Sequence, residues 1–406
     1  MKTFLQPLQN LAEMEEIQKQ AKKNRGILEI SGCMESQKAH LMYGLSGLFP
    51  CHLVIAADEK SAKELYEDYR FYDKRVYYYP AKDLLFFQAD IHGNLLIRQR
   101  MQVIRALLER EDEITVVTSI DGCMDYLAPL EKIEKQLIHF RNDSTLDMDK
   151  LTAALVHMGY ERVGQVEMPG QFSIRGGIID IYSLTEENPW RIELWGDEID
   201  SIRSFDAQSQ RSLENLDDVT IYPAAEQPME KNGVSFLDYF KETETLFFLD
   251  ELNHLEENAK AVQEEFQQSC ENRKEKGEIS LSGDWMCTWE ELCHKINDRN
   301  CVAMSLLDPK KSNWKISGQF NITVKSMSSY QSSFELLVKD LKQYKKEGYQ
   351  IVLLSGSRTR AERLAKDLQE EGLNAFYGQD SDRILQPGEI MVAYGHARRG
   401  FEYPLV

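Results

Sequence analysis

The stretch GILEISGCMESQKAHLMYGL, residues 26–45, decides the class of fold. Its apolar run at residues 27–30 has the composition of a buried strand, and a helical pattern with Lys38 near its start follows after Gly32. The order of strand, glycine turn and helix is that of a phosphate-binding loop in a nucleotide-binding parallel sheet. The stretch therefore predicts an α/β unit, and it raises the question of whether that unit binds a nucleotide.

A phosphate-binding loop of the pattern G-x-x-x-x-G-K-[ST] needs two glycines, a lysine for the outer phosphates and a hydroxyl for Mg²⁺. Counted from Gly32, its last three positions fall on Gln-Lys-Ala at 37–39, so the second glycine and the hydroxyl are missing. With Gly32 taken as an interior glycine, they fall on Met-Glu-Ser at 34–36, and the carboxylate of Glu35 would face the phosphates. We therefore expect Gly32, Glu35 and Lys38 to form a degenerate motif in a turn that binds no nucleotide.

A second candidate for nucleotide chemistry is TLFFLDE, residues 245–251, which has the form of a Walker B strand. In such a strand Asp250 would hold Mg²⁺ and Glu251 would orient the attacking water. An acidic pair after a buried strand also commonly begins a solvated loop. Without a working phosphate-binding loop, we expect no catalytic residue here.

The rhythm of apolar runs divides the chain into three expected domains. Residues 1–126 and 215–330 alternate short apolar runs with amphipathic helices, which predicts a discontinuous α/β domain with a parallel sheet. Residues 127–214 contain closely spaced strands and one or two helices, which predicts an inserted α+β domain. Residues 331–406 predict a small α/β domain that ends abruptly, as if truncated.

Composition excludes several classes of protein. The 48 basic and 67 acidic residues of this 406-residue chain give a net charge of −19, which disfavours a broad phosphate-backbone footprint. Seven cysteines without a C-x-x-C pair indicate neither a disulfide framework nor a metal site. No apolar run approaches the ~18 residues of a membrane span, so we expect a cytoplasmic protein with no membrane partner, no metal and no cofactor.

The stretch that most strongly suggests binding to another protein is PGQFSIRGGIIDIYSLTEENPWRIELWGDEIDSIRSFDAQSQRS, residues 169–212. In RIELW, the two-residue period of a strand puts Arg191 and Trp195 on the face opposite the apolar side chains. We expect both to be exposed, with Arg175 close by on a neighbouring strand. Two interpretations remain open: cross-strand packing of the indole on an arginine stem, or a protein-binding hot spot, where Trp and Arg are enriched.

The motifs GQFSIRGGIIDIY, RIELWGDEIDSIRSFDAQSQRS and GFEYP together resemble the transcription-repair coupling factors (Mfd), in the region that they share with the repair protein UvrB. The resemblance spans essentially all of the chain. It implies a UvrB-like, RecA-type parallel-sheet domain that has lost its ATPase site, an inserted domain, and a small α/β domain. The degenerate motif at Gly32, Glu35 and Lys38 and the acidic pair Asp250-Glu251 then become relics.

The resemblance also implies a partner and a docking site. The inserted domain is similar to the one by which both proteins bind UvrA, and the contacting arginines and aromatic residue fall on Arg175, Arg191 and Trp195. UvrB's DNA-inserting hairpin would fall after YYYPAKDLLFFQAD, where the chain leaves little room for it. RNA polymerase and DNA are expected to be bound only by other regions of the full-length family proteins, which are ATP-dependent DNA translocases.

Two functions follow as expectations. The first is a UvrA-recruiting module in transcription-coupled nucleotide excision repair of damaged DNA, with no enzyme activity in this fragment. The alternative is part of an ATP-dependent helicase or translocase whose degenerate nucleotide motifs still work. The missing Gly-Lys-[ST] favours the first.

Overall fold

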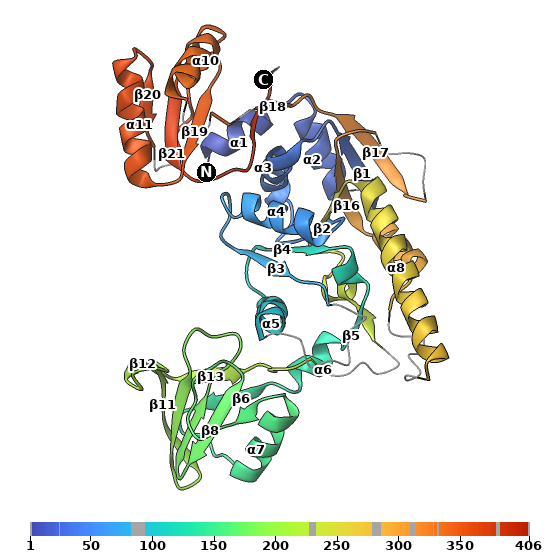
Figure 1. Cartoon of the computed structure of the whole chain (residues 1–406), viewed down its shortest axis with the longest axis vertical. Coiled ribbons are helices and arrows are strands. Elements are labelled where there is room, and N and C mark those ends of the chain that lie inside the picture. Colours follow the sequence, from blue (N-terminus) through green and yellow to red (C-terminus); the bar gives the residue numbers. More distant parts are fainter. Residues whose placement is uncertain are drawn as a thin grey trace.

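The computed structural model describes residues 2–23, 25–82, 94–226, 233–277, 286–308, 313–327, 329–330, 333–378 and 382–404. Its largest sheets have seven, six and three strands. Figure 1 shows the seven-stranded sheet in the middle of the molecule, with the other two at opposite ends. The three sheets therefore form separate units along the molecule.

The seven-stranded sheet is parallel throughout, with the strand order β17-β1-β16-β15-β2-β4-β3. Its strands are drawn from both halves of the expected discontinuous domain. The predicted class, a parallel α/β domain with a further unit inserted in it, is confirmed. The strands are β1 (Gly26–Ser31), β2 (Cys51–Ala56), β3 (Val76–Tyr79), β4 (Ile114–Ser119), β15 (Thr245–Asp250), β16 (Asn300–Ser305) and β17 (Ile316–Asn321).

Helices cover both faces of this sheet, because its strands are apolar on both sides. Alternate residues such as Leu53 and Val54 enter two different cores. One core packs against α5 (Asn94–Leu108), α6 (Leu130–Glu134), α8 (Leu252–Glu275) and α9 (Trp289–Asn297). The other packs against α1 (Lys2–Gln9), α2 (Met14–Lys23), α3 (Glu35–Ser46) and α4 (Glu59–Tyr69).

The six-stranded sheet has the order β12-β11-β10-β9-β8-β7 and is antiparallel except for the pair β7 and β8. One of its faces packs with α7 (Met148–His157) into a core of its own. The predicted turn residues Gly196-Asp197 join β10 to β11, and Gly196 has a φ of 64°. The strands are β7 (Glu161–Arg162), β8 (Gln171–Arg175), β9 (Ile178–Ile181), β10 (Trp190–Trp195), β11 (Glu198–Phe205) and β12 (Ser212–Leu216).

The core of the six-stranded sheet also contains residues beyond 214, the expected end of the inserted domain. Strand β13 (Asp218–Ile221) pairs with β6 (Ile138–Arg141), and its Val219 and Ile221 join the core of the six-stranded sheet. The connections to the seven-stranded sheet contain the short strands and 3-10 turns η2 (Asp121–Cys123), β5 (Tyr126–Leu127), β14 (Val234–Ser235) and η3 (Phe236–Tyr239).

The third unit follows the expected order of helix, strand, helix, strand and strand. Its sheet is parallel, and its elements are α10 (Phe334–Lys346), β19 (Ile351–Ser355), α11 (Arg358–Glu370), β20 (Ala375–Tyr377) and β21 (Ile390–Tyr394). The chain then returns to the first unit, where β22 (Gly400–Glu402) pairs with β18 (Lys325–Met327). Tyr403 is buried in the core beneath α3 and α4.

Three expectations concern the DNA-inserting hairpin, membrane-spanning helices and metal ligands. The position of the family's DNA-inserting hairpin, after residue 82, lies outside the described residues. None of the described helices combines the length and apolar character that a membrane crossing needs. Within the described ranges, no three His, Cys, Asp or Glu side chains gather in a way that could hold a metal ion.

Candidate protein-binding site

The backbone of the degenerate phosphate loop is already hydrogen-bonded within the protein. The Gly32 amide donates to the carbonyl of Leu306 (3.2 Å), and the Cys33 amide donates to that of Ser305 (3.0 Å). The Met34 amide donates to Oε1 of Gln37, 3.2 Å away. Since a phosphate loop binds through free amides, these three are unavailable to a nucleotide.

The chain also fills the space that the loop would need. Gly32 has a φ of 81°, and a Cβ built on it would lie 2.0 Å from the carbonyl oxygen of Ile322. The Ile322 amide in turn donates to the carbonyl of Ser31, 3.0 Å away. The glycine is therefore needed here for close approach of the chain's own backbone, not of a phosphate.

Lys38, Asp250 and Glu251 are brought together, as the expected relic motifs require, but they bind one another. Nζ of Lys38 lies 2.6 Å from Oδ1 of Asp250 and 2.6 Å from Oε1 of Glu251. Burial alone would lower the pKa of Lys38, but the two carboxylates outweigh it and raise the pKa, so the ammonium stays charged. The arrangement is a closed ion-pair cluster. Glu35 lies apart from it, at the start of α3, 3.6 Å from Nε of Arg399.

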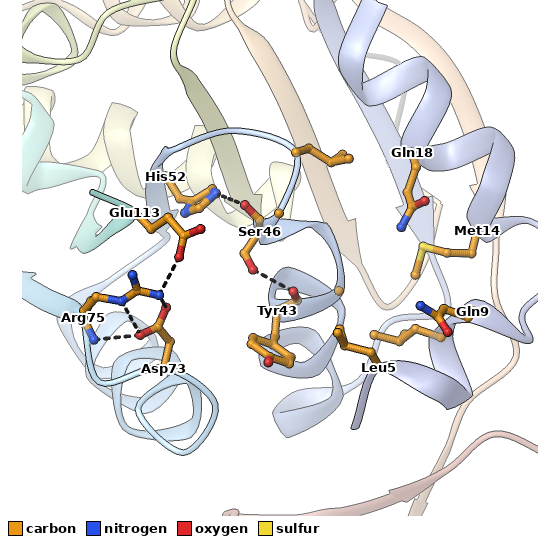
Figure 2. A pocket seen from close by; sticks show the side chains of 14 residues that line it. Leu5, Gln9, Met14, Gln18, Tyr43, Ser46, His52, Asp73, Arg75 and Glu113 are labelled. Carbon is orange, nitrogen blue, oxygen red and sulfur yellow. Dashed lines mark hydrogen bonds and ion pairs between the residues drawn. The ribbon is translucent and has the colours of Figure 1, made fainter. Parts of the chain in front are cut away.

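The structure also contains a cavity of about 410 Å³ beside α1, α2 and α3. Figure 2 shows Met14 between Gln9 and Gln18 along one wall and charged or aromatic polar groups such as His52 and Arg75 along the other. The cavity lies near residue 51, where β2 begins, whereas the ion-pair cluster of Lys38 lies where β15 ends. It is therefore distinct from the degenerate nucleotide site.

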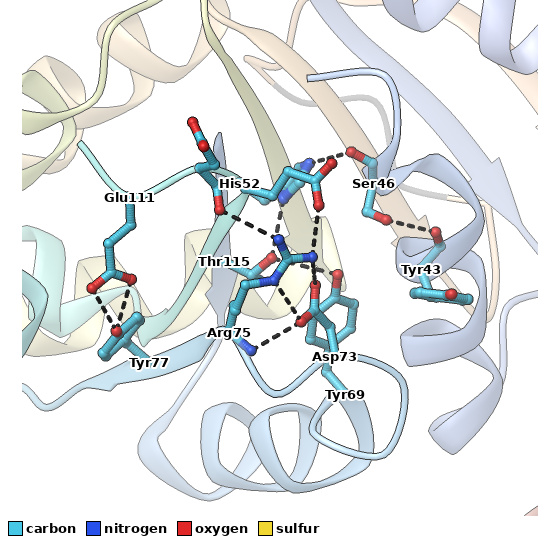
Figure 3. A network of polar contacts seen from close by, with 11 residues as sticks. Tyr43, Ser46, His52, Tyr69, Asp73, Arg75, Tyr77, Glu111 and Thr115 are labelled. Carbon is cyan, nitrogen blue, oxygen red and sulfur yellow. Dashed lines mark hydrogen bonds and ion pairs between the residues drawn. The ribbon is translucent and has the colours of Figure 1, made fainter. Parts of the chain in front are cut away.

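The polar groups on the side of His52 and Arg75 are paired with neighbouring side chains and backbone (Figure 3). Nη2 of Arg75 lies 2.6 Å from Glu113 and 3.2 Å from Asp73. His52 donates through Nε2 to the carbonyl of Ser46 (2.8 Å), and its Nδ1 lies 3.0 Å from Oγ1 of Thr115. Burial lowers the pKa of His52 and keeps the ring neutral. The network stabilises this corner of the fold and does not indicate a ligand.

The open face of the six-stranded sheet presents a different arrangement. Alternation along β10 is as predicted, because Ile192 is fully buried while the side of the strand with Trp195 faces outward. Trp195 is 83% exposed, the largest exposed fraction among the large apolar side chains of the described residues. An indole left in water at the end of a strand, beside a tight turn, is available to a partner.

Arg191 differs from what we expected. Its side chain is only 13% exposed and lies against the ring of Phe205, with its guanidinium carbon 4.3 Å from the ring centroid. Nε and Nη2 donate to the two carboxylate oxygens of Asp180 at 2.7 and 2.9 Å, and Nη2 also lies 2.9 Å from Gln210. The prediction that Arg191 is exposed beside Trp195 is therefore wrong: the side chain is an internal support of the sheet.

Arg175 does reach the same place, but from two strands away. Strand β9 lies between β8 and β10, and it contributes the fully buried Asp180. Nη2 of Arg175 donates to Oδ2 of Asp180 at 2.7 Å, while 47% of the Arg175 side chain stays exposed. Both expected arginines are thus held by one carboxylate.

Sequence reasoning missed Asp180 and Gln210. Asp180 had a signal, since it is the one charged residue of the apolar run IIDI in β9. A charge on a buried strand needs a partner, which could have directed attention to the arginines of β8 and β10. Gln210 lies after β11 with a φ of 60°, in a turn whose return path the sequence pattern does not reveal.

Comparison with known proteins identifies this part of the chain. Residues 138–226 match the family model of the UvrB interaction domain. Over 93% of its length the chain is 28% identical to the transcription-repair-coupling factor of Bacillus subtilis (strain 168), 38% of which is covered. Over 81% it is 25% identical to that of Staphylococcus haemolyticus (strain JCSC1435), 32% of which is covered. The chain is similar to transcription-repair-coupling factors.

The resemblance drawn from the sequence is therefore confirmed. The region that matches the UvrB interaction domain contains β6 to β13, and with them Arg175, Asp180, Arg191 and Trp195. The chain spans about a third of the length of the transcription-repair-coupling factors that it matches.

Proposed function

We propose that this chain is the UvrA-recruiting part of a bacterial transcription-repair-coupling factor, acting in transcription-coupled nucleotide excision repair of DNA. The docking surface is the open face of the six-stranded sheet around Trp195 and Arg175, with Arg191 behind it. We also propose that the docking domain extends to about residue 226, flanked by the UvrB-like domain, and that the third domain begins near residue 331. RNA polymerase and DNA would bind to parts of the relatives that this chain does not match.

One observation carries the proposal: an 83% exposed tryptophan lies on a region that matches the UvrB interaction domain. Apolar surface is less stable in water than when buried, so the exposure of this indole favours a partner that covers it. Trp and Arg are also the residues most enriched among the anchors of protein interfaces. Arg175, two strands away on the same sheet, supplies a half-exposed charge.

Titration of purified UvrA into the whole chain tests the proposal. Trp195→Ala should weaken UvrA binding by roughly 30-fold or more, because truncating a central aromatic anchor typically costs ~2–4 kcal/mol. The melting temperature should stay nearly constant, because exposed positions change folding stability by about 0.5 kcal/mol or less.

The matched control is Val156→Ala. Val156 is 57% exposed and lies on α7, whose Leu151 and Leu155 pack into the core of the same sheet. Val156→Ala should leave the affinity for UvrA unchanged. Wild-type affinity in Trp195→Ala, or an equal loss in Val156→Ala, would remove Trp195 from the docking surface.

We further propose that this fragment does not bind or hydrolyse ATP. Support comes from the amides of Gly32 and Cys33, which already donate to backbone carbonyls, and from the pairing of Lys38 with Asp250 and Glu251. Calorimetry with Mg²⁺ and ATP should give no binding at micromolar protein. Micromolar affinity, or ATP turnover that Asp250→Ala abolishes, would favour the alternative of a working motor.

A further inference from the structure

We infer that Asp180 is the positioning residue of the docking surface: it fixes Arg191 as an internal support and holds Arg175 as the guanidinium that meets a carboxylate of the partner. The inference rests on the proposed function, because it concerns the same surface. It gives the two arginines different roles and adds a third residue that does not touch the partner.

The geometry around Asp180 is that of a shared acceptor. Its side chain is fully buried, and its two oxygens accept three hydrogen bonds. Oδ1 accepts from Nε of Arg191 (2.7 Å), and Oδ2 accepts from Nη2 of both Arg191 (2.9 Å) and Arg175 (2.7 Å). A buried carboxylate persists only with such partners, so it constrains both guanidinium groups.

The two arginines retain different capacities to bind a partner. Arg191 uses Nε and Nη2 on Asp180 and Gln210, and its flat face lies on Phe205. The side chain of Arg175 donates one hydrogen bond to Asp180, and this is the only one that it makes to the described residues. With 47% of that side chain exposed, Arg175 keeps an edge of two or more N–H groups that a carboxylate can accept bidentately.

Charge favours the same choice of ligand. Two guanidinium groups and one carboxylate leave this cluster with a surplus of one positive charge, on a chain whose net charge is −19. Arg175 is the more exposed of the two guanidinium groups, so it is the one that presents positive charge to a partner. Because Asp180 already orders this long side chain in the free protein, its ordering cost is reduced when the partner binds.

A double-mutant cycle on the whole chain tests the inference, with UvrA affinity as the readout. Arg175→Ala should weaken binding about tenfold, and Asp180→Asn should weaken it by a similar factor, because residues that act through one contact are coupled. In the Arg175→Ala background, Asp180→Asn should change affinity by less than about twofold. Independent, multiplicative losses in the folded variants would overturn the inference, since a merely structural carboxylate would act equally in both backgrounds.

A second variant decides the matter if Asp180→Asn fails to fold. Arg175→Lys keeps the charge at a half-exposed position but loses the planar fork that Asp180 orients. It should weaken binding about fivefold or more, with an unchanged melting temperature. Wild-type affinity in Arg175→Lys would overturn the inference, because charge alone would then suffice.

The Trp195→Ala variant separates this inference from the proposed function. Weak binding by Trp195→Ala together with wild-type binding by Arg175→Lys overturns only the role of Asp180 and Arg175. Wild-type binding by both variants overturns the docking surface itself, and the inference with it.

Discussion

Two arginines of the same sheet face show how environment decides the role of a residue. Arg191 is 13% exposed and sits between Asp180 and the ring of Phe205, whereas Arg175 is 47% exposed and bonded only through one nitrogen. Removing one partner of a buried ion pair leaves an uncompensated charge, which costs far more than removing an exposed one. The two positions should therefore respond differently to truncation.

Arg191→Ala should lower the free energy of unfolding of its domain by about 3 kcal/mol, since it breaks a buried pair. Arg175→Ala should lower it by less than about 1 kcal/mol, because Arg191 still neutralises Asp180. Hydrogen exchange of the amides of β9 and β10 measures both values. Equal effects of the two substitutions would contradict the assignment of Arg191 as an internal support.

For single residues, the sequence predicted which side chains point away from the core better than it predicted which side chains they contact. The two-residue period correctly turned Trp195 away from the core, since alternation depends only on the strand itself. The burial of Arg191 depends on Asp180, which lies opposite it in the pairing of β9 with β10. No local pattern specifies which strands are neighbours, so that contact could not be predicted.

At the scale of elements, the connection from β1 to α3 shows how a turn can keep the outline of a phosphate loop while its backbone serves the fold. Gly32 has a φ of 81° and faces the carbonyl of Ile322. Gly47, at the other end of α3, has a φ of −69°, and a Cβ added to it would point into open space, with no described atom beyond its own neighbourhood within 4 Å. Gly32 and Gly47 therefore make a matched pair for substitution, because an added Cβ would collide with backbone at the first and would meet no described atom at the second.

Gly32→Ala should lower the free energy of unfolding by more than about 2 kcal/mol, because it combines a left-handed conformation with a backbone collision. Gly47→Ala should be neutral or raise it by up to about 1 kcal/mol, through loss of freedom in the unfolded chain. Chemical denaturation of the two variants tests the difference. A harmless Gly32→Ala would mean that the 322 segment does not lie against the loop.

Most of the long elements were predictable, and the short ones were not. The parallel sheet and its helices have strong periodic patterns, as in the buried strand β4 (Ile114–Ser119). The pairing of strand β13 was not predictable, because its four residues carry little pattern and it pairs with β6 across 77 residues of sequence, from Arg141 to Asp218. Contacts over such separations are decided by packing, which periodicity does not report.

For the molecule as a whole, residues 398–403 connect the third unit to the first. Arg398 lies 2.8 Å from Glu64 and 3.1 Å from Asp68, both on α4. The Tyr403 hydroxyl accepts from Nε2 of Gln37 (3.1 Å) and lies 2.9 Å from Nδ1 of His40. His40 also bonds to the carbonyl of Phe4 in α1 through Nε2. One buried imidazole therefore holds segments from both ends of the sequence.

This contact should make stability depend on pH. Burial lowers the pKa of His40 to about 4, from about 6.5 in the unfolded chain. Between these values the unfolded state binds more protons, so the contribution of His40 is complete above pH 6.5 and is lost as the pH falls toward 4. The melting temperature of the wild type should therefore fall more steeply between pH 7 and about pH 5 than that of His40→Gln. Parallel curves would show that His40 is not held neutral.

The ion-pair cluster of Lys38, Asp250 and Glu251 and the hydrogen bonds of the loop before α3 bear on what completing the phosphate-loop consensus would do. Restoring the consensus with Gln37→Gly and Ala39→Ser would supply the missing glycine and hydroxyl, but the Gly32 and Cys33 amides would remain bonded to β16 and the residue after it. Gln37→Gly would also remove a donor to Tyr403. The two substitutions would therefore leave the amides of the loop occupied, and freeing them would need coordinated change in the neighbouring strand as well.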